Sequence, residues 1–102
     1  MALVTMYTTP WCPYCIAARE LLQRLGVEYE DINVGSDRAL RAEMEMRAGR
    51  YTVPQIWIGS RHVGGFDDMN ELHHRGLLEP LLEEMARGGD GAATYNTTER
   101  MN

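Results

Sequence analysis

The sequence contains no lysine, no long apolar run and only two cysteines among its 102 residues. All ten basic side chains are arginine, and fifteen acidic residues leave a net charge of −5, which argues against a general nucleic-acid-binding surface. No apolar run approaches the roughly 20 residues that a membrane-spanning helix needs. No basic segment precedes an apolar stretch near the N-terminus, so we expect no secretory signal, a cytoplasmic location and no membrane partner.

The remaining composition is that of one small globular domain, with 44% hydrophobic and 25% charged residues. Two cysteines are too few for a disulfide scaffold, so their spacing indicates chemistry instead. From Gly88 onward the composition changes to GGDGAATYNTTERMN, which shows no apolar periodicity. We therefore predict a single domain over residues 1–87, a flexible tail over 88–102 and a monomer.

Hydrophobic patterning predicts four strands and three helical segments. The expected strands are Leu3–Tyr7, Val27–Val34, Gln55–Ile58 and Arg61–Gly64, the last two joined as an antiparallel hairpin by Gly59-Ser60. The first helix is predicted to begin at Cys12-Pro13 and to end at Gly26, with an apolar stripe of Ile16, Leu21, Leu22 and Leu25. The second helix is predicted from Ser36 or Asp37 to about Ala48. The third helical segment is predicted to be capped by Asp67 or Asp68, to break near Gly76 and to restart at Pro80. Because strand, helix and strand follow one another over about 30 residues, the first two strands should be parallel.

Cys12-Pro13-Tyr14-Cys15 is the strongest chemical signal in the chain. A cysteine at a helix N-cap faces unpaired N–H groups and the positive helix end, which favour the thiolate, the nucleophilic form. Cys15 lies one turn further on, within reach of a disulfide. The alternative is half of a zinc site, but the other candidate ligands, His62, His73 and His74, lack a second paired spacing. We therefore predict redox chemistry and no metal.

Two further motifs follow at a distance in the sequence. Thr52-Val53-Pro54 precedes the third strand, and a cis bond before Pro54 would turn the Val53 backbone groups outward beside Cys12, where a peptide-like substrate could pair with them. Gly64-Gly65-Phe66-Asp67-Asp68 joins the fourth strand to the last helix, whose N–H groups could receive a carboxylate. An ordinary trans proline and a plain turn with a helix cap are the alternatives.

Taken together, the three motifs in this order and spacing resemble a glutaredoxin, closest to the small bacterial dithiol type, over about residues 3–85. The element order β-α-β-α-β-β-α, with a four-stranded mixed sheet flanked by helices, is likewise thioredoxin-like. The resemblance implies a thioredoxin fold, a cis Pro54, and glutathione as the co-substrate that recharges the protein. It also implies reduction of protein disulfides and glutathione mixed disulfides, with Cys12 attacking and Cys15 resolving.

The resemblance also assigns a glutathione site. Tyr14 would flank the tripeptide beside the sulfur, Val53 would pair with its cysteinyl unit, and Asp67 would take its ammonium group. Arg41, in the second helix, would partner the glycine carboxylate. The complete set that the resemblance implies is Tyr14, Thr52, Val53, Pro54, Gly65, Phe66, Asp67 and Arg41.

Two alternatives remain open within this reading. Many glutaredoxins carry a lysine shortly before the first cysteine, whereas Thr8-Thr9-Pro10-Trp11 has no cation. This difference, together with Trp11, motivates a second hypothesis: an electron donor to ribonucleotide reductase that is recharged by thioredoxin reductase. The other alternative is a protein that binds a [2Fe–2S] cluster between two chains through Cys12 and glutathione. We expect Trp11 to pack in the core or at the rim beside the site, without a specific role.

Overall fold

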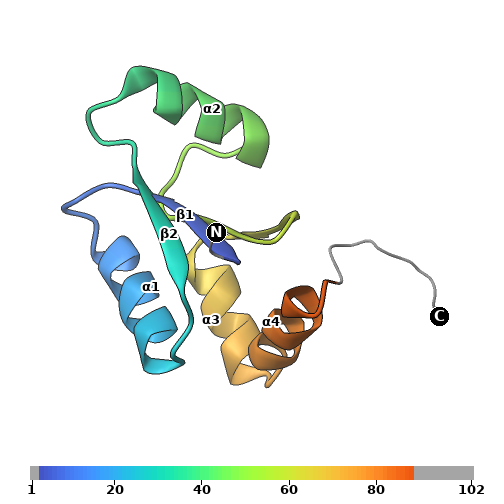
Figure 1. Ribbon diagram of the computed structural model, residues 1–102. Coiled ribbons are helices and arrows are strands. Elements are labelled where there is room, and N and C mark those ends of the chain that lie inside the picture. The colour runs from blue at the N-terminus through green and yellow to red at the C-terminus, as the bar shows by residue number, and fades with distance from the viewer. Residues whose placement is uncertain (1–2, 89–102) are drawn as a thin grey trace.

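A mixed four-stranded sheet forms the centre of the computed structural model, which describes residues 3–88 (Figure 1). The strands are β1 (Val4–Thr8), β2 (Tyr29–Asn33), β3 (Gln55–Ile58) and β4 (Arg61–Gly64), in the spatial order β2-β1-β3-β4. β1 is parallel to β2 and antiparallel to β3, and β3 is antiparallel to β4. The predicted parallel pair and the predicted hairpin are both confirmed.

Helices cover both faces of the sheet (Figure 1). α1 (Pro13–Arg24), α3 (Phe66–His74) and α4 (Leu78–Ala86) lie on one face, and α2 (Arg38–Ala48) lies alone on the other. Because both faces are covered, the central strands carry apolar side chains on both sides instead of alternating with polar ones. This explains why apolar residues occur at successive positions in β1 and β3, as in Met6-Tyr7 and Ile56-Trp57-Ile58.

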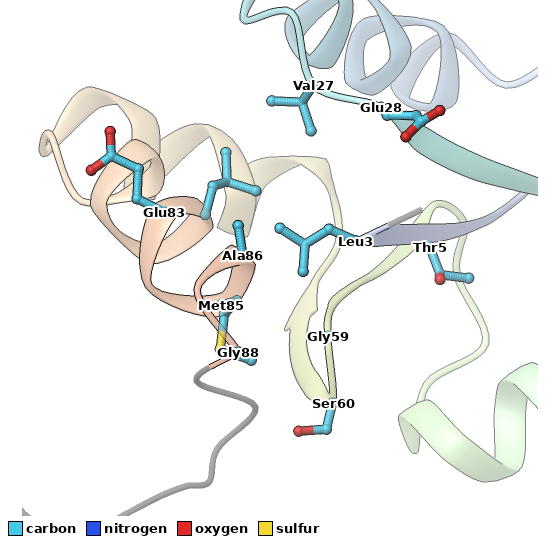
Figure 2. Close-up of a pocket in the computed structure, with 11 residues that line it drawn as sticks. Leu3, Thr5, Val27, Glu28, Gly59, Ser60, Glu83, Met85, Ala86 and Gly88 are labelled. Carbon is cyan, nitrogen blue, oxygen red and sulfur yellow. The ribbon is translucent and has the colours of Figure 1, made fainter. Parts of the chain in front are cut away.

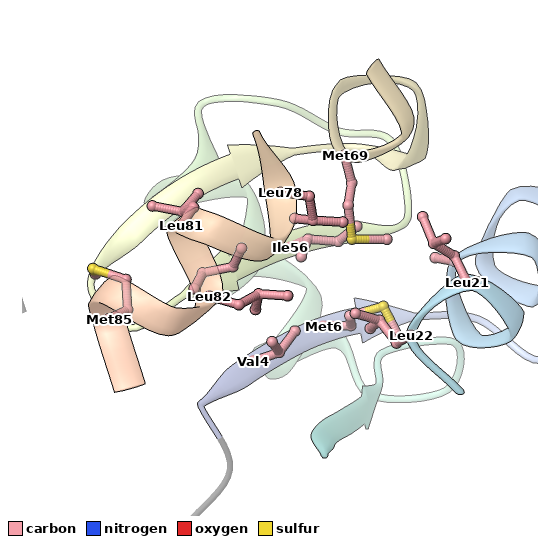
Figure 3. Close-up of a cluster of buried hydrophobic side chains, with 12 residues drawn as sticks. Val4, Met6, Leu21, Leu22, Ile56, Met69, Leu78, Leu81, Leu82 and Met85 are labelled. Atoms are coloured by element: carbon pink, nitrogen blue, oxygen red, sulfur yellow. The ribbon is translucent and has the colours of Figure 1, made fainter. Parts of the chain in front are cut away.

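The larger core lies between the sheet and α1, α3 and α4 (Figure 3). Val4 and Met6 of β1 point to this face, as do Ile56 and Ile58 of β3, because side chains alternate along a strand. The helices contribute the remaining buried side chains, namely Ala18, Leu21, Leu22, Met69, Leu78, Leu81, Leu82 and Met85. A smaller cluster of Tyr7, Val34, Met44 and Trp57 lies on the α2 face.

The structure corrects several predicted boundaries. β1 runs from Val4 to Thr8, and β2 is shorter than predicted. Ile16 is predicted to lie in the apolar stripe of α1 but is exposed, whereas Ala18 of the same helix is buried in the larger core. The helical position that faces the sheet depends on how α1 is rotated, which a short apolar pattern does not specify. The second helix is confirmed, with Asp37 as its cap and Gly49 at its end.

The last helical segment also starts differently from the prediction. The N-cap of α3 is Gly65, and Asp68, at the third helical position, accepts the Gly65 N–H at 2.9 Å. Either aspartate could cap a helix by sequence, but here Asp68 acts from inside the first turn. α4 begins at Leu78, so Pro80 lies in its first turn. No helix in residues 3–88 is long and apolar enough to cross a membrane. The predicted tail lies almost entirely outside the described residues.

Candidate active site

Cys12 stands at the N-terminus of α1, where Pro13 begins the helix. Its sulfur accepts the backbone N–H of Cys15 at 3.3 Å, which confirms the predicted N-cap. The Cys12 thiol lies 3.5 Å from the carbonyl oxygen of Val53 and donates to it. The sulfur is therefore held between the positive helix end and the loop before β3, and its side chain remains partly exposed.

Cys15 has a very different environment, because it is completely buried. Burial raises the pKa of its thiol to about 12, and the hydrogen bond from Cys15 to the Cys12 side chain acts in the same direction. A backbone hydrogen bond with Thr9 and the charge of Arg19 oppose this rise in the pKa of Cys15 without cancelling it. At neutral pH, Cys15 is therefore a protonated thiol that substrate cannot reach.

The buried side-chain amide of Gln55 fixes the Thr52–Pro54 loop before β3 through hydrogen bonds. The Val53–Pro54 bond is cis, as the resemblance implied. Gln55, fully buried, donates from Nε2 to the Thr52 carbonyl at 3.0 Å and to the Thr52 hydroxyl at 3.2 Å. Its Oε1 is 2.8 Å from Nε2 of His62, which therefore donates to it. From the sequence Gln55 is predicted only as the first residue of a strand, although a polar residue at the start of a buried strand indicates a hydrogen-bonding role.

A groove of about 280 Å³ adjoins this loop and the first turn of α3. Seven of the eight residues that the resemblance assigned to glutathione line it, namely Tyr14, Thr52, Val53, Pro54, Gly65, Phe66 and Asp67. The fold therefore brings together segments that lie up to about 50 residues apart in the sequence. Arg50 and Asp68 complete the lining.

Arg41 is the residue that does not line this groove. Its Nε is 3.2 Å from Glu45 Oε2, and its Nη2 donates to the carbonyl of Tyr51. It borders another hollow, formed with residues 34–38. The cation that lines the groove is Arg50, which lies two residues before the Thr52-Val53-Pro54 turn.

Arg50 and Asp68 form one wall of the groove through a 3.0 Å ion pair. The Gly65 N–H, and then Arg50, hold the pKa of the Asp68 carboxyl below its usual range. Gly64 lies directly beneath this pair with a φ of +119°, and a Cβ there would collide with the Asp68 carboxylate. Only glycine satisfies both the backbone conformation and the close approach.

A larger hollow, of about 870 Å³, lies between the start of β1, the β3–β4 turn and α4 (Figure 2). Leu3, Val27, Gly59 and Met85 are among the residues that line it, and neither cysteine is. Size alone would select this hollow, but it offers no redox-active group. Reactive sulfur, backbone hydrogen-bonding groups and a cation all meet at the smaller groove, which is therefore the candidate site. Among residues 3–88, no three His, Cys, Asp or Glu side chains gather as metal ligands.

Comparison with known proteins supports this choice. The family model described as Glutaredoxin matches residues 4–63. Over 79 residues the chain is 54% identical to Glutaredoxin from Pseudomonas aeruginosa, covering 78% of this chain and 94% of that protein. Over 83 residues it is 47% identical to Glutaredoxin 3 from Escherichia coli K12, covering 81% of this chain and 100% of that protein.

Solved structures agree with the sequence comparisons. The buckwheat glutaredoxin–glutathione complex has a TM-score of 0.77 at 31% identity, covering 83% of this chain and 80% of that chain. The solution structure of glutaredoxin from Brucella melitensis has a TM-score of 0.73 at 46% identity, covering 92% and 96%. The chain therefore belongs to the glutaredoxin family and is a glutathione-dependent thiol–disulfide oxidoreductase with a thioredoxin-like fold.

Proposed function

We propose that Cys12 attacks the substrate disulfide and that Cys15 resolves the resulting mixed disulfide. The observation that carries this division of roles is the contrast between the two thiols. Cys12 is partly exposed at the positive end of α1, whereas Cys15 is buried with its pKa raised to about 12 by that burial. Since only Cys12 is accessible and Cys15 keeps its proton, the first covalent bond forms at Cys12.

The proposed reaction with a protein disulfide moves two electrons in two exchanges. The Cys12 thiolate attacks one substrate sulfur, forms a Cys12–substrate disulfide and expels the other sulfur as a thiolate, which water protonates. Cys15 then loses its proton to water and attacks the Cys12 sulfur, expelling the second substrate thiolate. The resulting Cys12–Cys15 disulfide is reduced by two glutathione molecules, which leave as glutathione disulfide.

With a glutathione mixed disulfide, Cys12 alone is sufficient. It attacks the glutathione sulfur and releases the substrate thiolate, and a second glutathione attacks the Cys12–glutathione disulfide to release glutathione disulfide. We therefore expect Cys15 to be needed for protein disulfides and dispensable for glutathione mixed disulfides.

The groove beside Cys12 is the proposed binding site for glutathione. Val53 backbone groups would pair with the cysteinyl unit of glutathione, and Tyr14 would flank that unit. Asp67 would bind the ammonium group of the γ-glutamyl end, and the N–H groups in the first turn of α3 would bind the carboxylate of the same end. Thr52, Pro54, Gly65 and Phe66 shape the walls. Arg50 supplies positive charge there, in a chain with no lysine before Cys12. Arg41 remains the proposed partner of the glycine carboxylate, although it lines a different hollow and pairs with Glu45.

The wider role follows from the same chemistry. We propose that the protein acts as a monomer in the cytoplasm, that protein disulfides are among its substrates, and that ribonucleotide reductase is one candidate among them. Glutathione would recharge it, as the glutathione-dependent family implies. No observation on the described residues favours recharging by thioredoxin reductase or a [2Fe–2S] role over this function.

A coupled assay tests the proposal. NADPH consumption is followed with glutathione, glutathione reductase and a small glutathione mixed disulfide, and in parallel with a disulfide-bonded protein. Cys12→Ser should abolish both reactions, whereas Cys15→Ser should abolish only the second. Loss of the glutathione mixed-disulfide reaction in Cys15→Ser would contradict the division of roles.

Turnover of wild type with thioredoxin reductase but not with glutathione would refute recharging by glutathione. A coloured protein after anaerobic iron–sulfur reconstitution would support a cluster role.

A further inference from the structure

We propose that Arg19 is a positioning residue whose charge lets the buried Cys15 thiol act as the resolving nucleophile. This inference rests on the proposed function and deepens it, because it concerns the second exchange, in which Cys15 attacks the Cys12 sulfur. It assigns a role to a polar contact between α1 and the sheet that the first exchange does not use.

The polar contact joins the middle of α1 to β1 and β2. Thr8, the last residue of β1, and Gln55 are the buried polar residues among residues 3–88. The Thr8 hydroxyl accepts from Nη2 of Arg19 at 3.0 Å and donates to Oδ1 of Asp31. Nε of Arg19 donates to Oδ2 of Asp31 at 2.6 Å. Two of its nitrogens are therefore bonded, so the guanidinium group is held in one orientation.

The spacing on α1 brings Arg19 next to Cys15. The two residues are four apart in the helix, so their side chains lie one turn from each other on the same side of α1. Both also meet the end of β1, since Cys15 has a backbone hydrogen bond with Thr9 and Arg19 bonds to Thr8. Cys15 is completely buried and the Arg19 side chain is only 24% exposed, so water and salt screen the charge less than at the surface.

The resolving exchange depends on the ionisation of Cys15. Burial raises the pKa of its thiol to about 12, and the charge of Arg19 acts in the opposite direction. The charge of Cys12 also raises the pKa of Cys15. Once Cys12 is bonded to a substrate it carries no charge, so this opposition ends while the effect of Arg19 persists. The guanidinium of Arg19 therefore favours the Cys15 thiolate in the state in which that thiolate is needed.

The bonds that change in this exchange involve only sulfur and one proton. The Cys15 S–H bond breaks and the proton goes to water. The thiolate attacks the Cys12 sulfur, forms the Cys12–Cys15 bond and expels the substrate as a thiolate. Over both exchanges the two cysteines lose two electrons and the substrate disulfide gains them. Arg19 makes no covalent bond and acts through the charge of the thiolate, and Asp31 limits its effect because the carboxylate partly neutralises the guanidinium.

Single-turnover kinetics separate the two exchanges. Reduced protein is mixed with an equimolar disulfide-bonded peptide and quenched with acid, and mass spectrometry counts the mixed disulfide and the Cys12–Cys15 disulfide. Arg19→Gln should form the mixed disulfide at the wild-type rate and resolve it about fivefold more slowly, because the Cys15 thiolate fraction falls. Between about pH 6 and pH 9, well below the pKa of Cys15, this ratio of rates should stay constant.

Three further variants distinguish the charge of Arg19 from its packing. Arg19→Lys keeps the charge and should resolve the mixed disulfide within about twofold of the wild-type rate. Asp31→Asn keeps an acceptor for Arg19 but removes the opposing charge, so resolution should be roughly twofold to threefold faster. Arg24→Gln removes a charge from the exposed last turn of α1 and should match wild type. Arg19→Lys as slow as Arg19→Gln, slower resolution in Asp31→Asn, or an equal loss in Arg24→Gln would overturn the role of the Arg19 charge.

Cys15→Ser distinguishes a failure of this inference from a failure of the proposed function. If Cys15→Ser still completes reduction of the peptide, Cys15 is not the resolving thiol, and the division of roles fails together with the role of Arg19. If Cys15→Ser stops at the mixed disulfide while Arg19→Gln and Asp31→Asn resolve it at the wild-type rate, the proposed function stands and only the role of Arg19 fails.

Discussion

The two faces of the sheet are covered by different kinds of contact. On the side of α1, α3 and α4, the twelve buried core residues are all apolar (Figure 3). On the α2 side, two of the four buried side chains, Tyr7 and Trp57, contact each other edge to face and also make polar or cation–π contacts. Tyr7 donates to Glu43 at 2.8 Å and accepts from Arg47 at 2.7 Å, and the guanidinium of Arg47 lies 4.4 Å from the centre of the Trp57 ring.

The polar contacts of the α2 side continue into the active site. The α1 side has polar contacts of its own, since Arg19 donates to buried Thr8 at 3.0 Å and pairs with Asp31, but its twelve-residue core cluster is apolar. His62 stacks on Trp57 at 4.6 Å and holds Gln55, which in turn holds Thr52 in the loop beside Cys12. Dispersion and apolar burial stabilise a fold without fixing the orientation of any one side chain, whereas a hydrogen bond requires a defined geometry of its donor and acceptor. We infer that the apolar face supplies most of the stability, and that the α2 face positions the substrate-binding loop.

The largest effect should come from the apolar face. Leu22→Ala removes a completely buried side chain and leaves a cavity, so we expect the free energy of unfolding to fall by about 2–5 kcal/mol. KM for a glutathione mixed disulfide should stay at the wild-type value in the folded fraction. Urea unfolding and the coupled assay measure the two quantities. Leu77→Ala, half exposed, is the control and should change stability by less than about 0.5 kcal/mol. A raised KM in Leu22→Ala would remove the distinction between the faces.

A smaller effect, of a different kind, should come from Gln55→Leu. The substitution removes the amide that donates to Thr52 and leaves His62 without its acceptor. Losing one directing hydrogen bond of about 1 kcal/mol should raise KM for the glutathione mixed disulfide roughly fivefold, with little change in kcat.

Tyr7→Phe provides the matched control for Gln55→Leu, because it also removes hydrogen bonds on the α2 face. The Tyr7 hydroxyl bonds to Glu43 and Arg47, and neither bond involves Thr52 or Gln55. We expect Tyr7→Phe to reduce stability and leave KM unchanged. Equal KM values in Gln55→Leu and Tyr7→Phe would show that the network does not position the loop.

The smallest effect should appear only in acid. Because the folded-state pKa of Asp68 is lowered, its contribution to stability is present above the ordinary carboxyl pKa and is lost as the pH falls below roughly 4. Asp68→Asn should therefore lose less stability than wild type between pH 5 and pH 2. The Arg50–Asp68 pair is exposed, so the difference should stay below about 1 kcal/mol. Thermal unfolding at several pH values measures it. A match between Asp68→Asn and wild type would contradict the assignment.

Short-range signals in the sequence were reliable where one residue type decides the backbone. Cys12-Pro13 begins α1, Asp37 caps α2, and Gln55–Ile58 and Arg61–Gly64 are the two hairpin strands, as predicted. Start positions with two plausible caps were less reliable. Asp67 and Asp68 could each cap the third helical segment by sequence. In the structure the Asp68 carboxylate lies against Gly64 and Arg50 inside the first turn of α3, and Gly65 is the N-cap.

The sequence by itself determined which residues carry the chemistry, because the spacing of Cys12 and Cys15 and the Pro13 helix start are local features. The tertiary structure decided how those residues differ. It buries Cys15 and exposes Cys12, since the rotation of α1 against the sheet determines which thiol meets the core. It also places Arg50 on the groove and Arg41 elsewhere, and it brings Gln55 under Thr52. These contacts join segments distant along the chain, so no local pattern could specify them.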